Sequence, residues 1–191
     1  MSYNSLQMQI KYPEIGICGL SCRLCPNYQT AAASKCRGCK SPERMAVGCP
    51  FLTCVIKKMG VEFCWDCGEN ESCEKWKRHR EIGKERDSFK SYQKLEDDIN
   101  FIQVNGIKIY DEQQKIRETL LIRMLNEFNE GRSNSYYCIA VTVMDINELR
   151  SSLEEADAKS KSLSVKEKSR TMHSLLDSIA VKKGYRLSLR K

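Results

Sequence analysis

The feature that most constrains this chain is the clustering of its cysteines. Ten of the 11 cysteines fall between Cys18 and Cys73, and Cys138 stands alone in the second half. Thiols at this density either join as disulfides or gather around metal ions. The first part of the chain is therefore expected to owe its fold to sulfur chemistry more than to a large apolar core.

The choice between disulfides and metal depends on the compartment. Residues 1–11 contain no basic segment followed by an apolar run, so we expect no secretory signal peptide and a cytoplasmic location. The longest apolar stretch, residues 136–144, is shorter than the ~20 residues of a membrane span, so no membrane partner is expected. Disulfides are rare in a reducing cytosol, and metal binding is therefore favoured over a disulfide scaffold.

The spacing of the cysteines is typical of zinc sites. Three C-x2-C pairs occur, at Cys22/Cys25, Cys36/Cys39 and Cys64/Cys67, and two such pairs complete one tetrahedral site. Ten thiols would allow about two zinc ions with two cysteines left over, but the spacing does not say which cysteines share a site. The predicted metal ligands are Cys18, Cys22, Cys25, Cys36, Cys39, Cys49, Cys54, Cys64, Cys67 and Cys73.

An iron–sulfur cluster is the alternative cofactor. The Cys25-Pro26 and Cys49-Pro50 steps are similar to ferredoxin sequences that end in Cys-Pro, although the spacing C-x2-C-x2-C-x3-C is absent. Cys18-x3-Cys22-x2-Cys25 also matches the cluster motif of radical S-adenosylmethionine enzymes, but the long series of β/α units of those enzymes is missing. Thiolate softness alone does not separate zinc from iron–sulfur.

One stretch of sequence has a familiar form. Residues 17–26 read ICGLSCRLCP, residues 36–39 read CRGC, and Cys49, Cys54, Cys64, Cys67 and Cys73 follow. This pattern resembles a prokaryotic cysteine-rich family known as a domain of unknown function and presumed to bind zinc or an iron–sulfur cluster. The resemblance covers residues 17–73. It implies a metal-binding cysteine domain and brings no catalytic residue with it.

The sequence predicts an α+β protein in two parts. Residues 1–78 form a small cysteine-rich metal-binding domain, and residues 79–191 form a helix-rich α/β layer with a short sheet. Strands are predicted at 136–144, from the β-branched and aromatic residues there, at 185–189 as a half-buried edge strand, and at 107–110 as a short strand. Helices are predicted from Asp111 toward Gly131, from Asp145, and from Ser164 to Gly184, each start carrying a capping-box pair.

Three functions are compatible with these features. We favour a zinc-stabilised interaction module with a protein partner; the sequence gives neither that partner nor the oligomeric state. The first alternative is an iron–sulfur protein in electron transfer or redox enzyme maturation. The second is a zinc-dependent nucleic-acid-binding protein that uses residues 75–94 and the cations Lys35, Arg37, Lys40, Lys57 and Lys58.

An enzyme is not favoured. The chain has no P-loop, nucleophile elbow, H-E-x-x-H or G-x-G-x-x-G motif. His79 is interpreted as a solvated residue of the basic run at residues 77–80, and Cys138 as a small buried apolar side chain. Eight thiolates on two zinc ions would also lower the formal net charge from +7 to about +3, which weakens the nucleic-acid hypothesis.

Overall fold

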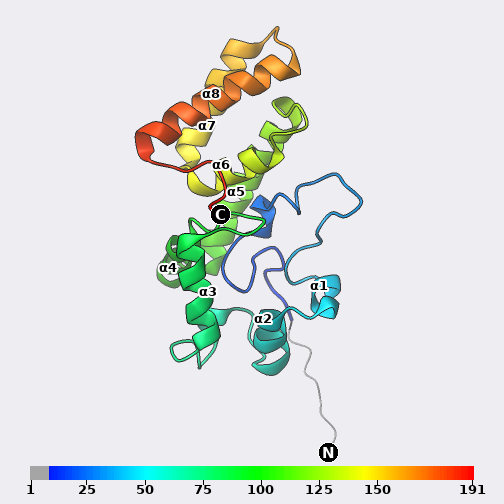
Figure 1. Cartoon of the computed structure of the whole chain (residues 1–191), viewed down its shortest axis with the longest axis vertical. Coiled ribbons are helices and arrows are strands. Elements are labelled where there is room, and N and C mark those ends of the chain that lie inside the picture. Colours follow the sequence, from blue (N-terminus) through cyan, green and yellow to red (C-terminus); the bar gives the residue numbers. More distant parts are fainter. Residues whose placement is uncertain (1–8) are drawn as a thin grey trace, which may run out of the picture.

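The described part of the chain is mainly helical, with long loops in its first third (Figure 1). The structure is a computed structural model that describes residues 9–191. The prediction that residues 1–11 are not a signal peptide therefore falls mostly outside the described residues. Helices contain 59% of the described residues and strand positions 1%, and residues 9–191 contain no sheet. The α+β class with a short sheet was therefore wrong. The single antiparallel bridge in this part of the chain joins Ile15 to Ser21.

Four helices form the main apolar core in the second half of the chain. α5 (Ile107–Glu127) packs against α6 (Asn134–Val143) and α7 (Ile146–Ser160), and α7 pairs with α8 (Val165–Lys183). Figure 1 shows α7 and α8 side by side at the end of the molecule away from α1 and α2. The predicted starts at Asp145 and Ser164 are confirmed, because both positions form capping boxes with the acid three residues on.

The segment 136–144 is a helix and not a strand. α6 lies at the centre of the core, and Tyr137, Ile139, Ala140 and Val141 are all buried. A short apolar run that is buried on every side has the same composition in a central helix and in a central strand, so periodicity cannot separate the two. Contacts with α5 and with the residues of α7 and α8 decide the outcome here.

The other two predicted strands are also absent. Residues 107–110 are the first turn of α5, which starts four residues before the expected Asp111. Residues 185–189 are an extended tail with no partner strand among residues 9–191. Their alternation is real, since Tyr185, Leu187 and Leu189 pack on the core, but within residues 9–191 no ladder of a sheet joins the tail to another segment.

The cysteine-rich part consists of short elements joined by loops. In chain order they are η1 (Cys22–Leu24), α1 (Pro42–Val47), α2 (Pro50–Leu52), the π-helical turn η2 (Thr53–Lys58) and η3 (Cys64–Asp66). α3 (Glu74–Glu85) and α4 (Leu95–Asn105) follow and connect this part to α5. The division predicted at residues 78 and 79 falls within α3 and stays a prediction.

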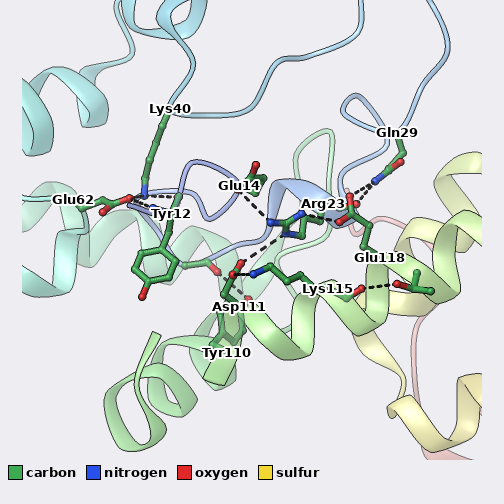
Figure 2. A network of polar contacts seen from close by, with 12 residues as sticks. Tyr12, Glu14, Arg23, Gln29, Lys40, Glu62, Tyr110, Asp111, Lys115 and Glu118 are labelled. Atoms are coloured by element: carbon green, nitrogen blue, oxygen red, sulfur yellow. Dashed lines mark hydrogen bonds and ion pairs between the residues drawn. The ribbon is translucent and has the colours of Figure 1, made fainter. Parts of the chain in front are cut away.

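A polar network connects residues 18–25, which we call the first cysteine loop, to α5 (Figure 2). The Arg23 guanidinium reaches Glu118 at 2.8 Å, Glu14 at 3.3 Å and Asp111 at 3.7 Å. Next to it, the buried Tyr110 hydroxyl lies 2.9 Å from the carbonyl oxygen of Gly19. These contacts set the position of residues 18–25 relative to the helical core.

The linker between α3 and α4 is held by the C-terminal tail. The buried Asp87 carboxylate accepts hydrogen bonds from the Arg190 guanidinium at 2.9 Å and from its backbone N–H at 2.7 Å. Burial favours the neutral acid, but the bonds from Arg190 and from the Tyr92 N–H lower the pKa of Asp87 below its ordinary value. The tail therefore fixes the segment that contains Lys90.

None of the helices in residues 9–191 combines the length and the apolar composition that crossing a bilayer requires.

Candidate metal centre

The first three cysteines lie on a tight loop. The N–H of Gly16 donates to the carbonyl of Leu20 at 2.9 Å, and Gly19 turns the chain with a φ of +93°. A Cβ at Gly19 would lie 3.2 Å from the Trp65 ring, so both the backbone and the space require glycine. η1 then places Cys22 and Cys25 on one turn, with the Cys25 N–H on the Cys22 carbonyl at 3.0 Å.

The Cys36–Cys39 pair folds back onto this loop. The backbone N–H of Cys39 donates to the Cys22 sulfur at 3.2 Å, and Gly38, with a φ of +107°, allows that approach. The Cys36 N–H bonds the carbonyl of Asn27 at 2.8 Å. Hydrogen bonding from Cys39 lowers the pKa of Cys22 to about 6, against the effect of burial.

These two pairs share one hollow. Cys22, Cys25, Cys36 and Cys39 all line a cavity of about 570 Å³, which we call the first hollow. Lys35 and Arg37 stand at its exposed side. Two C-x2-C pairs therefore meet in space, as a four-thiolate site requires.

Four later cysteines line a second and much smaller hollow. They are Cys54 in η2, Cys64 at the start of η3, Cys67 at its end, and Cys73 immediately before α3. This second hollow encloses about 30 Å³ among Phe51, Val55 and Trp76. Burial and the neighbouring thiols of Cys18, Cys73, Cys54 and Cys67 raise the pKa of Cys64.

Three cysteines remain outside both sets. Cys18 lines neither hollow and packs against the apolar cluster that contains Cys64. Cys49 immediately precedes α2 and is half-buried. Cys138 is buried in α6, which raises its pKa to about 12, as expected for a small side chain of the core.

The sulfurs are near one another without forming a coordination shell. All 11 cysteines are free thiols. Within residues 9–191, no group of three or more His, Cys, Asp or Glu side chains has an arrangement that could hold a metal ion. The structure thus brings eight of the ten predicted ligands into two sets of four, and it does not test their role as ligands.

A buried lysine that the sequence did not single out lies beside the first hollow. Lys90 is 7% exposed, and its ammonium donates to the carbonyl of Ser21 at 2.9 Å. No carboxylate of residues 9–191 lies within ion-pair distance of it. Burial opposes its charge, but the thiols of Cys22, Cys39, Cys25 and Cys18 raise its pKa above the ordinary value.

Lys40 is also buried, which removes it from the predicted nucleic-acid surface. It is 2% exposed, and its ammonium lies 2.8 Å from Glu62 and 3.1 Å from the carbonyl of Tyr12 (Figure 2). It also lies 3.8 Å from the centre of the Phe63 ring. The sequence around Cys36 and Cys39 did not indicate that the Lys40 side chain is buried.

His79 is not the solvated residue that the basic run suggested. Its ring packs on Phe51, Trp76 and Tyr92, with ring centres 5.0 to 5.8 Å apart. Burial lowers its pKa. It lies beside the residues of the second hollow without lining it.

Comparison with known proteins leaves the function open. No curated protein and no solved structure matches the chain. Residues 14–78, which hold all ten clustered cysteines and run into α3, match the model of the family described as "Protein of unknown function (DUF3795)".

Proposed function

We propose that residues 14–78 bind two metal ions through thiolates and that the protein is a zinc-stabilised interaction module. The first site would use Cys22, Cys25, Cys36 and Cys39. The second would use Cys54, Cys64, Cys67 and Cys73. Cys18 and Cys49 would be the two surplus thiols.

The observation that carries the proposal is the burial of Lys90 beside thiols and away from carboxylates. A buried ammonium without a counter-charge is strongly destabilising. Without metal, only Cys22, with a pKa of about 6, would be charged at pH 7, because the pKa values of Cys18, Cys25 and Cys39 are raised above the ordinary value. Four thiolates around a divalent ion carry a net charge of −2, because metal ligation deprotonates the thiols. A four-thiolate site next to Lys90 would therefore explain why that lysine is tolerated there.

The small apolar content of the segment supports the same proposal. Its loops contribute only a few fully buried aliphatic side chains, Ile15, Ile17, Leu20, Leu24, Leu52 and Val55. A segment with so little to bury needs another source of folding energy. A structural zinc site contributes on the order of 10 kcal/mol.

Zinc is favoured over iron–sulfur by the size of the second hollow. The four cysteines line a hollow of only about 30 Å³. That room is close to the share of one water molecule in the liquid, so it suits a single ion better than a cluster of several iron and sulfide atoms. The first hollow is much larger, at about 570 Å³. An iron–sulfur cluster there is the second candidate.

Elemental analysis of anaerobically purified protein tests the proposal. About two zinc ions per chain and no absorption band near 400 nm are expected. Cys39→Ser and Cys67→Ser should each retain about one zinc ion, and Cys138→Ala is the control that should retain two. A brown protein with iron and acid-labile sulfide would establish the alternative, and a chain that takes up no metal would reject both.

The interaction role is separable from metal binding. We expect the partner to be a protein, because Lys40 and Lys90 are buried and Arg80 is paired with Glu96. A salt titration with mixed RNA and DNA separates the two readings. Affinity that falls steeply between 50 and 200 mM salt would favour the nucleic-acid alternative.

A further inference from the structure

A partly open cavity with many polar lining residues lies between the first cysteine loop and the helices. It has a volume of about 180 Å³ and is bounded by residues 20–24 of that loop, the Lys90 linker, α4, α5 and α6. This is the room that about six water molecules take up in the liquid. The size admits a small metabolite and excludes a nucleotide or a peptide.

The wall of this cavity holds a second inward-facing cation without a carboxylate partner. Arg117 of α5 donates through one terminal nitrogen, Nη1, to the carbonyl oxygens of Val141 at 2.5 Å and Met144 at 2.7 Å. Its Nη2 and Nε make no hydrogen bond to another residue within 9–191, and no acid there lies within ion-pair distance. Two donors of a guanidinium therefore remain for a ligand, in the fork that fits a carboxylate.

Two neutral groups on the same wall also have unused hydrogen-bonding capacity. The hydroxyl of Ser21 is buried, with the residue 5% exposed, and it has no partner in the described part of the chain. The carboxamide of Gln114 lies on a residue that is 4% exposed, and it makes no hydrogen bond to residues 9–191. Buried polar groups are nearly always paired, so the Ser21 hydroxyl points to something that enters the cavity.

The lining of the cavity also includes acidic residues, among them Asp98. The Asp98 carboxylate lies 2.9 Å from the Tyr110 hydroxyl, which is also 2.9 Å from the carbonyl of Gly19. Tyr110 has one proton for these two acceptors. A hydroxyl or ammonium group on a ligand would give Asp98 a second donor.

We propose that this cavity binds a small hydroxy or amino acid, with the carboxylate on Arg117, Ser21 and Gln114 and the hydroxyl or amino group facing Asp98. Lys90 also lines the cavity, where its ammonium donates to the carbonyl of Ser21, so Arg117 is the lining cation that keeps free donors for a ligand. No cysteine lines this cavity, so ligand binding and metal content are measured separately. Its chemistry is that of a binding site for a metabolite with a carboxylate and a neighbouring donor.

The test uses the full chain as purified and a panel of defined probes. Glycolate, lactate, malate, serine and aspartate are screened at millimolar concentration by thermal shift, and any that raises Tm is measured by isothermal titration calorimetry. Acetate and inorganic phosphate are the controls for charge alone. At least one hydroxy or amino acid should bind at least tenfold more tightly than acetate and phosphate.

Variants connect that binding to the cavity. Arg117→Lys should weaken the affinity by tenfold or more, and Arg123→Lys, on the same helix but outside the cavity, should leave it unchanged. Ser21→Ala removes a hydroxyl that has no partner within residues 9–191, so it should weaken binding severalfold without lowering Tm or the bound metal. It keeps the test decisive if Arg117→Lys does not fold.

Three results would overturn the inference. They are the absence of binding by every acid in the panel, equal or tighter binding of phosphate or acetate, and unchanged affinity in Ser21→Ala. None of these results bears on the zinc content.

Discussion

Replacement of Lys90 by methionine tests whether the first hollow binds a metal ion or contains only neutral thiols. Methionine keeps most of the apolar stem and removes the charge. A charge pair about 5 Å apart in an effective dielectric of about 20 is worth about 3 kcal/mol. If Lys90 offsets even one unit of negative charge on a four-thiolate site, Lys90→Met should weaken metal affinity at the first hollow on the order of 100-fold.

The assay is competition for zinc against a chromophoric chelator, which resolves a weaker and a tighter ion. The second hollow is an internal reference, because the charge interactions of Lys90 are with Cys18, Cys22, Cys25 and Cys39. Lys35→Met is the matched control, since Lys35 lines the first hollow but is exposed and screened by water.

The opposite outcome is equally distinct. In a protein whose thiols are neutral, removing a buried ammonium without a counter-charge is neutral or stabilising. Lys90→Met with unchanged zinc affinity and a higher free energy of unfolding would refute the charge argument and, with it, the main support for the metal site.

Three further perturbations test other parts of the structure by denaturant unfolding. Burial raises the pKa of Asp98 to about 6, so the stability that it contributes is complete below the unfolded pKa near 4 and is lost as the pH rises through 6. Asp98→Asn should remove this dependence, worth at most about 3 kcal/mol, and an unchanged pH profile would contradict it. Gly19→Ala should lower the free energy of unfolding by about 1–3 kcal/mol, because φ is positive there and the new Cβ would press on the Trp65 ring. Gly48→Ala should cost clearly less, since φ is also positive there but the space is open. Equal losses in the two variants would show that the ring has no role. Arg23→Met leaves Glu14 and Glu118 without their cation, while Asp111 keeps Lys115, and it should destabilise by about 1–3 kcal/mol. A loss of stability that is the same in 1 M salt would argue against an electrostatic cause.

Local chemistry in the sequence was a good guide to helix ends. The pairs Asp145/Glu148 and Ser164/Glu167 act within a single turn, so they specify a helix start wherever the helix is placed. Gly184 ends α8 in the left-handed conformation for the same local reason. The turn at Gly106 is also real, but α5 begins directly after it and not at Asp111.

Features that depend on the whole fold were not predictable. The β-branched and aromatic residues of 136–144 favour a strand in isolation, and burial among α5, α7 and α8 overrides that preference. Similarly, the spacing identified the C-x2-C pairs but not that Cys22/Cys25 meets Cys36/Cys39 while Cys64/Cys67 joins Cys54 and Cys73. Lys90 lay in a basic run that looked solvated, and only the path of the linker turns it inward.

The ion pair between Arg190 and Asp87 affects the order in which parts of the molecule can fold during synthesis. The two residues are 103 positions apart in the sequence. At ordinary rates of translation, the ribosome needs on the order of 10 s to add Arg190 after Asp87. During that interval the ten clustered cysteines are already made, while the linker that carries Lys90 still lacks its anchor. Full assembly around the first hollow is therefore a late event in biosynthesis, and a nascent chain halted before Arg190 would leave those thiols open to oxidation or to competing metals.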